Sequence, residues 1–320
     1  MDDLCLKYSE RNGQYMKNVL VIGGSAFTGR VFSIMASRNG GFELHVVNRG
    51  NHPLNLERVA QYKCDRHDAG ALPDLVPDVT YDALVDFCAY SPGEISPVVE
   101  ALGDRVKQYI FFSTASIYAP GDSFLGEGAP LLDAPGKEKG MVVEYVQGKI
   151  ALENELIAAC AGKGLHYTIL RPTFIYGPFN YAPRESYFIE KIAKKEAVPV
   201  PTDATSRFNF IYVLDIADAL MLCIGDEKAY DAAFNLAAPE AITYPGLLSC
   251  LETNNGGPFP TREVTIAQVE KESIPLPFPL TGDTLINGEK FAAAFGLNYT
   301  PFATGMEKTF NIFYTLYTES

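Results

Sequence analysis

The sequence predicts a doubly wound α/β fold built on a parallel sheet, and three observations support this prediction. An apolar run breaks into a glycine-rich turn and then opens a helix over residues 19–30. Strand and helix patterns alternate from there to residue 178, which is typical of a parallel sheet with helices on both faces. Of the 320 residues, 47% are apolar, which is enough to bury one large core.

The glycine-rich turn predicts a dinucleotide-binding loop. Gly23 permits a sharp turn after the first strand, and Gly29 lets the following helix pack close to that strand. Free backbone N–H groups at the start of the helix attract a pyrophosphate. The spacing Gly23-x-x-Ala26-x-x-Gly29 is typical of short-chain dehydrogenases. The residues expected to contact the cofactor in this loop are Gly23, Ser25, Ala26, Phe27, Thr28 and Gly29.

The carboxyl ends of the next two strands are predicted to contact the nucleoside part of the cofactor. The strand 44–47 ends in Asn48-Arg49 instead of the acid that would bind a ribose 2′-hydroxyl. Because Arg49 could pair with a 2′-phosphate, NADP is slightly favoured over NAD. A surface arginine that stacks on adenine is the alternative. The strand 62–65 ends in Asp65-Arg66, which would contact the adenine or form a plain strand-end turn.

Two further strands and a long loop complete this edge of the predicted sheet. The apolar run 83–90 predicts a strand buried on both faces, and its end at Cys88-Ala89 would pass beneath the cofactor. The strand 109–114 delivers hydroxyl groups at the carboxyl edge, where open α/β sheets bind ligands. The Gly/Pro-rich loop 120–140 is long enough to serve as an active-site lid.

The alternation of strands and helices breaks after Gly177 into a loop rich in proline and aromatic residues. It resumes near residue 208, where Asp215 is predicted to cap the helix 216–224. The chain is therefore expected to contain an N-terminal appendage (1–15), a dinucleotide-binding domain (16–178, with 206–240 returning to it) and a substrate-binding lobe (179–205 and 241–320).

Composition narrows the class of protein. The 26 basic and 39 acidic residues give a net charge of −13, which opposes a polyphosphate backbone and argues against general nucleic-acid binding. Six cysteines without a C-x-x-C pair indicate reduced thiols of a cytoplasmic protein. Because no apolar run is long enough to cross a bilayer, we expect no membrane partner. The expected partner is a small-molecule substrate, and a homodimer is left open.

The spacing Tyr145-x-x-x-Lys149 predicts an acid–base pair on one face of a helix. A phenol has a pKa of about 10, so a nearby ammonium and a positive nicotinamide ring are needed to prepare Tyr145 as a base. Thr114 would hold the same substrate hydroxyl. The predicted reaction is alcohol oxidation with hydride transfer to nicotinamide, or the reverse, and requires no metal. An exposed tyrosine beside a solvated lysine is the alternative, but the order of the motifs favours catalysis.

These motifs resemble the extended short-chain dehydrogenase/reductases, the NAD-dependent epimerase/dehydratase group, over nearly all of residues 16–300. The resemblance implies a Rossmann-type sheet and an NAD- or NADP-dependent enzyme. The matching stretches are 23–29, 112–118, Tyr145-x-x-x-Lys149, 170–172, 176–178, 207–215 and 234–236.

By this resemblance Thr114 takes the place of the family's catalytic Ser/Thr, and Arg207 that of an arginine that grips the diphosphate of a nucleotide sugar. Pro172 is expected to contact the cofactor. Tyr90, Ser116 and Phe174 are expected to contact the substrate.

The chain departs from the family pattern at three places. Ala26 replaces the middle glycine of the loop, and Phe174 stands where sugar-nucleotide enzymes often have asparagine. Ala115-Ser116 replaces the Asp-Glu pair of the sugar 4,6-dehydratases, which argues against dehydration. The segments 48–50, 64–66 and 86–92 are also similar to a branch related to chloroplast stem-loop RNA-binding proteins.

We therefore expect an enzyme that oxidises or reduces a secondary alcohol or ketone, similar to a nucleotide-sugar 4-epimerase. One alternative is an NADPH-dependent reductase of a non-nucleotide carbonyl substrate. Another is a relative that binds cofactor or RNA without turnover.

Overall fold

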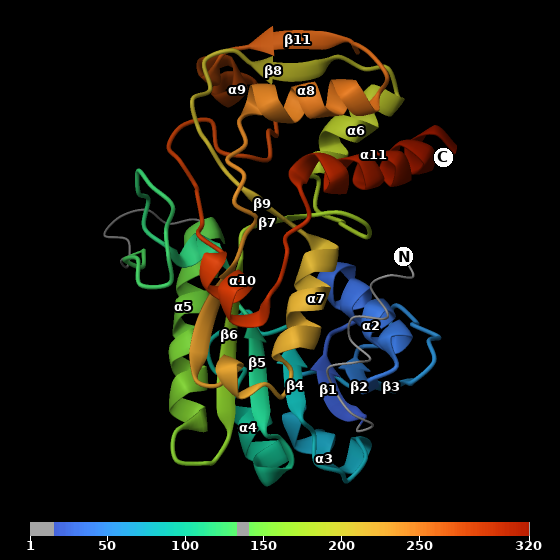
Figure 1. The fold of residues 1–320 in the computed structure, drawn as a ribbon, viewed down its shortest axis with the longest axis vertical. Helices are drawn as coiled ribbons and strands as arrows, with labels where there is room; N and C mark the ends of the chain where they lie inside the picture. The colour runs from blue at the N-terminus through green and yellow to red at the C-terminus, as the bar shows by residue number, and fades with distance from the viewer. Residues whose placement is uncertain (1–15, 133–140, 320) are drawn as a thin grey trace.

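The computed structural model describes residues 16–132 and 141–319, and its centre is a seven-stranded, fully parallel sheet (Figure 1). The strand order is β10-β6-β5-β4-β1-β2-β3, so the chain starts in the middle and winds outwards to both edges. The predicted fold class is therefore confirmed. The strands are β1 (Lys17–Ile22), β2 (Phe42–Asn48), β3 (Val59–Lys63), β4 (Ala83–Asp86), β5 (Gln108–Phe112), β6 (His166–Pro172) and β10 (Ala232–Leu236).

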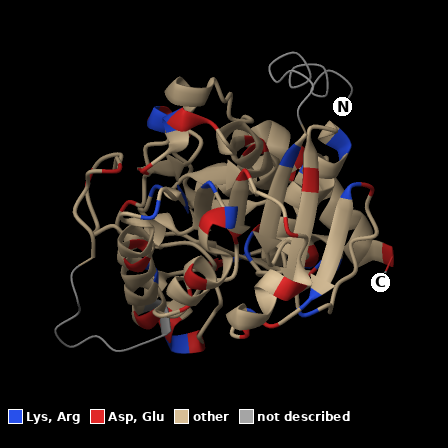
Figure 2. Cartoon of the chain, turned by 90° about the horizontal axis from the view of Figure 1, so that it is seen from below, with Lys and Arg blue, Asp and Glu red and all other residues tan. Residues whose placement is uncertain are grey.

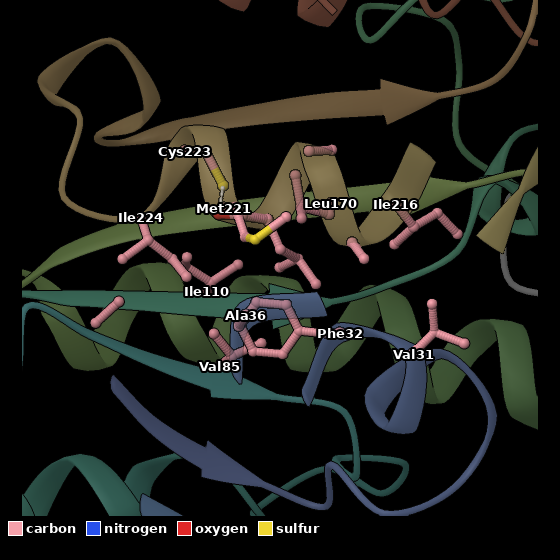
Figure 3. Close-up of a cluster of buried hydrophobic side chains, with 14 of the residues drawn as sticks. Val31, Phe32, Ala36, Val85, Ile110, Leu170, Ile216, Met221, Cys223 and Ile224 are labelled. Carbon is pink, nitrogen blue, oxygen red and sulfur yellow. Dashed lines mark hydrogen bonds between the residues drawn. The ribbon is translucent and has the colours of Figure 1, made fainter. Parts of the chain in front are cut away.

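Helices cover both faces of this sheet, and each face buries its own apolar cluster. On one face, α2 and α7 pack against the strands, and side chains such as Phe32, Val85 and Ile216 interdigitate there (Figure 3). On the other face, α3, α4 and α5 cover side chains such as Leu20 and Phe111. The helices are α2 (Phe27–Asn39), α3 (Leu72–Leu75), α4 (Ser96–Leu102), α5 (Met141–Cys160), α7 (Val213–Cys223) and α10 (Glu289–Phe295).

A second group of elements forms the upper part of the molecule in Figure 1 and shares a separate apolar cluster. Aromatic rings dominate this cluster, with Phe208 stacked on Phe278 at 5.0 Å and Phe210 stacked on Phe302 at 5.0 Å. Two short parallel strand pairs, β7–β9 and β8–β11, belong to this part. Its elements are α6 (Glu185–Ala193), α8 (Tyr244–Asn254), α9 (Ile266–Glu272), α11 (Phe302–Glu319), β7 (Phe174–Tyr176), β8 (Val198–Pro201), β9 (Phe210–Tyr212) and β11 (Thr261–Val264).

The structure differs from the sequence predictions at several element ends. The predicted cap Asp215 lies in the first turn of α7, whose N-cap position is Tyr212. The Asp215 carboxylate accepts hydrogen bonds from the backbone N–H (2.8 Å) and hydroxyl (2.7 Å) of Thr300, so it joins two distant segments. Strand β4 ends at Asp86, so residues 87–90 of the predicted strand already belong to the following loop. The predicted appendage 1–15 and residues 133–140 of the predicted lid lie outside the described residues.

The surface of the described chain carries both signs of charge. Figure 2 shows lysine and arginine interspersed with aspartate and glutamate, without a continuous basic band over the part of the chain described. Within residues 16–132 and 141–319, no helix has the length and apolar character that a bilayer crossing requires.

Candidate active site

The loop between β1 and α2 is shaped to receive a phosphate group. Gly23 has a φ of +100°, and a Cβ there would lie 2.5 Å from Cys88 Sγ, so only glycine fits. A Cβ on Gly29 would lie 2.7 Å from the Cα of Gly24, which explains how α2 packs so closely against the turn. The N-cap residue Ala26 supplies no side-chain cap, so the first N–H groups of α2 are left for a ligand.

This loop opens onto a cleft of about 540 Å³ at the carboxyl edge of the sheet. Its size is within the range of small-molecule sites. Most of the side chains predicted from the sequence line this cleft. These residues are Gly23, Ser25, Ala26, Phe27, Thr28, Gly29, Asn48, Arg49, Asp65, Arg66, Cys88, Tyr90, Thr114, Tyr145, Lys149 and Pro172.

Three predicted catalytic side chains meet at one end of the cleft. Thr114 follows β5, and its hydroxyl lies near enough to the phenol of Tyr145 on α5 to favour the phenolate. One turn further along α5, Lys149 donates from Nζ to the carbonyl oxygens of Ala89 (2.8 Å) and Phe112 (2.9 Å). The Lys149 ammonium also lies 4.7 Å from the ring centroid of Tyr90. The structure thus brings the threonine, the phenol and the amine into one small volume.

Burial shifts the pKa values of both helix residues. It raises the pKa of the Tyr145 phenol above its ordinary value, against the effects of the Thr114 hydrogen bond and the positive charge of Arg184. It lowers the pKa of Lys149 to about 8, although the Asp86 carboxylate favours the charged form. Two cations therefore lie near Tyr145: the Lys149 ammonium, 5.9 Å from the ring centroid and bound to two backbone carbonyls, and Arg184, whose charge favours the phenolate.

At the nucleoside end of the cleft, the side chain of Asn48 is used by the protein itself. Its Nδ2 donates to Gly23 O (3.1 Å), and its Oδ1 accepts from Gly50 N (2.8 Å) and Gln61 Nε2 (2.9 Å). Its neighbour Arg49 is exposed and lines the cleft. Of Asn48 and Arg49, only Arg49 therefore has a side chain that is available to contact the ribose of a cofactor.

Arg66 combines a place in the cleft lining with a structural ion pair. Its guanidinium makes two hydrogen bonds, of 2.9 and 3.1 Å, to the fully buried carboxylate of Asp86. The Asp86 carboxylate also accepts from the Tyr109 hydroxyl (2.6 Å). At the rim, His67 bridges Asp65 (2.7 Å) and Glu94 (3.1 Å). The predicted contact of Asp65 and Arg66 with adenine remains a prediction.

Four of the predicted residues do not line the cleft. Ala89 contributes through its carbonyl, which binds Lys149. The exposed Ser116 accepts a hydrogen bond from Thr114 Oγ1 (3.2 Å). Phe174 packs edge-on against Phe278, with a centroid distance of 5.4 Å. Arg207 forms an exposed ion pair with Asp283, and its predicted contact with a diphosphate remains a prediction.

Sequence reasoning missed two side chains that line the catalytic end of the cleft, Tyr181 and Arg184. Both lie on the loop between β7 and α6, where no periodic pattern or motif marks a function. Tyr181 is 76% exposed and touches Phe27 of the glycine-rich loop edge-on, with centroids 6.1 Å apart. Only the three-dimensional contact between these two loops places them in the site.

The parallel sheet, the phosphate loop and the Thr–Tyr–Lys group together define a dinucleotide-binding α/β protein. The model of the NAD dependent epimerase/dehydratase family matches residues 19–237, and the chain belongs to this family.

Among curated relatives, the chain is 26% identical to the chloroplast stem-loop binding protein of 41 kDa b from Arabidopsis thaliana. That match covers 76% of this chain and 65% of the relative. The chain is also 24% identical to the UDP-glucose 4-epimerase of Vibrio cholerae, and this match covers 44% of the chain and 42% of that enzyme. The chain thus spans less than two thirds of the length of these relatives.

Among solved structures, the UDP-glucuronic acid 4-epimerase of Bacillus cereus in complex with NAD superposes with a TM-score of 0.74. The sequence identity is 16%, and the match covers 94% of this chain and 99% of that one. At this level of identity the likeness establishes the shared fold.

Proposed function

We propose that the protein is an NAD(P)-dependent enzyme that interconverts a secondary alcohol and a ketone at the Thr114–Tyr145–Lys149 end of the cleft. The single observation that carries this proposal is that Thr114, Tyr145 and the buried Lys149 line the same cleft as the phosphate loop, with the Lys149 ammonium 5.9 Å from the Tyr145 ring centroid. Three features of the cleft fit a dinucleotide. Free N–H groups at the start of α2 can bind the pyrophosphate, Arg49 can contact the ribose, and the volume of about 540 Å³ is that of a small-molecule site.

A bound nicotinamide ring would supply the hydride acceptor or donor. During oxidation the substrate hydroxyl would lose its proton to Tyr145, while Thr114 fixes the hydroxyl by a hydrogen bond. During reduction Tyr145 would return that proton to the new alkoxide. Lys149 would bind ribose hydroxyls of the cofactor and hold the Ala89 and Phe112 carbonyls in place.

For the substrate, we propose a sugar nucleotide and a 4-epimerase reaction as the first candidate. The family and the named relatives support this class. The positions of Phe174 and Arg207 outside the cleft favour the second candidate, a reductase of a carbonyl compound without a nucleotide. A relative that only binds RNA agrees poorly with a net charge of −13 and with the interspersed charges of Figure 2.

We further propose that residues 16–178 and 206–240 hold the cofactor and that 179–205 and 241–320 form the substrate lobe. The separate apolar cluster of the upper part of Figure 1 supports this division. The exposed Arg49 supports a preference for NADP.

The test is turnover of a panel of sugar nucleotides and simple ketones by wild type and by Tyr145→Phe. Removal of a general acid–base should lower kcat by about 100-fold or more. Tyr230→Phe is the matched control, because Tyr230 lies outside the cleft lining and stacks on His166. Equal turnover by wild type and Tyr145→Phe would refute the catalytic role of the phenol.

A further inference from the structure

We propose that Arg184 is a specificity-determining residue that binds a negatively charged group, such as a carboxylate, close to the reacting carbon of the substrate. This inference rests on the proposed function, because it assumes that the substrate reacts beside Tyr145. The inference adds a substrate class to the proposed function: alcohols or ketones that carry a negatively charged group next to the reacting carbon.

The loop that carries Arg184 is held in place by its own hydrogen bonds. The buried Glu185 carboxylate accepts from Gly177 N (3.0 Å) and from Asn180 Nδ2 (3.0 Å). Asn180 in turn accepts from Ala182 N at 3.0 Å. The conformation of this loop is thus fixed from its first residue to the start of α6.

Arg184 itself is half-buried, and its guanidinium has donors to spare. Nη1 donates to the carbonyl oxygen of Ile175 at 3.1 Å, which anchors one edge of the group. No carboxylate of the described residues forms an ion pair with it. Its charge acts on the phenol of Tyr145 and on the Glu185 carboxyl, which is already occupied by other donors. An anchored arginine with unused N–H groups is well suited to bidentate binding of a carboxylate or phosphate.

The distribution of the other charged residues in the cleft also favours binding of an anion near Tyr145 and Arg184. Its two lining carboxylates, Asp65 and Glu94, both bind His67 at the rim. Of the cations that line the cleft, Lys149 lies 5.9 Å from the Tyr145 ring centroid and Arg184 acts on the Tyr145 phenol through its charge. Lys149 is 2% exposed and bound to two carbonyls, so Arg184 is the cation open to a substrate.

The arginine expected from the family resemblance is not in a position to do this. The carboxylate of Asp283 accepts from Arg207 N (2.8 Å) and Nε (3.0 Å), and also from Nη2. Arg207 does not line the cleft. Of these two arginines, only Arg184 lines the cleft that contains Tyr145.

The test uses two pairs of probes that differ in one carboxylate: UDP-glucuronate with UDP-glucose, and glucuronate with glucose. Calorimetry measures their binding to the NAD-loaded Tyr145→Phe protein, which cannot turn them over. We expect tighter binding of the carboxylate member of at least one pair, by about tenfold to hundredfold. Arg184→Gln, added to that background, should abolish the preference, and Arg184→Lys should restore part of it. Arg262→Gln, a change at an exposed surface pair with Glu272, is the matched control.

Equal binding within both pairs, or no binding of either carboxylate probe, would overturn the proposal. The proposal would also be overturned if Arg207→Gln abolished the preference for the carboxylate probe while Arg184→Gln retained it. The affinity for NAD should stay within about twofold in Arg184→Gln, and a loss of about tenfold would assign Arg184 to the cofactor instead. If a probe binds tightly but the wild type, supplied with NAD or NADP, forms neither an epimerised product nor reduced cofactor, the proposed function alone would be refuted.

Discussion

The buried ammonium of Lys149 makes a measurable prediction about stability. The side chain is 2% exposed and its pKa is lowered to about 8 from an ordinary value of 10.5, chiefly because burial removes water from the charge. Lys149→Met keeps the length of the side chain and removes the ionisable group. The hydrogen bonds to Ala89 and Phe112 are lost in this variant at every pH, so they do not contribute to a pH-dependent difference.

The sign follows from proton binding in the two states. Below the folded pKa of about 8 both states are protonated, and the full cost of burying the charge, about 3 kcal/mol, is present. Between about 8 and 10.5 the unfolded chain binds more protons, so stability rises with pH. The free energy of unfolding of wild type relative to Lys149→Met should therefore rise by about 2 kcal/mol or more from about pH 7 to about pH 10.

Urea unfolding curves of both proteins at several pH values in this range measure the difference. Titratable groups remote from Lys149 contribute equally to the pH dependence of the unfolding free energy in both proteins. Their contributions therefore cancel when the two unfolding free energies are subtracted. A difference that stays constant with pH, or that falls as pH rises, would show that Lys149 is not held as a desolvated cation.

Two further predictions concern the cofactor. Gly29→Ala should weaken NADH binding by about tenfold or more, because the new Cβ would lie 2.7 Å from the Gly24 backbone and push α2 away from the loop. Titration followed by NADH fluorescence measures the affinity. An unchanged affinity would contradict this prediction. Arg49→Ala should weaken NADPH binding about three- to tenfold and NADH binding by less than about twofold. Equal losses for both cofactors would show that Arg49 does not read a 2′-phosphate.

The cofactor side of the molecule was accessible to sequence reasoning because its signals are local. A strand, a glycine turn and a helix follow one another without interruption, and the steric reason for Gly23 and Gly29 is the same in the structure as in the motif. Tyr145 and Lys149 are four residues apart on one helix, so helical geometry alone brings them to one face. Thr114 could be added because parallel strands end at a common edge.

The substrate side was not accessible because its contacts join distant segments. Arg207 matches the family motif, yet a carboxylate 76 residues away occupies it. Arg184 follows a loop without periodicity, and its place in the cleft depends on the buried Glu185 behind it. Elements α8, β11, α9 and α11 were not predicted individually; α11 packs against α6 and α8, and β11 pairs with β8, so these contacts join segments far apart in the sequence.

Several motif residues that resemble the family serve the fold instead of the chemistry. Arg171 makes a buried ion pair with Glu153 (2.6 Å) and donates to the Tyr118 hydroxyl (2.8 Å). Tyr118 donates to Asn235 Oδ1 (2.7 Å), and the backbone N–H of Asn235 donates to a Glu127 carboxylate oxygen (2.8 Å). Removing one member would leave a buried polar group without its partner, which is costly.

This network ties β6, β10 and α5 to the loop after β5, beside the catalytic threonine but outside the cleft lining. Selection on such residues preserves the scaffold whatever substrate is bound. A family match that depends on them therefore identifies the fold, while under our proposal the substrate is selected by Arg184, which lies outside the motifs that carry the family resemblance.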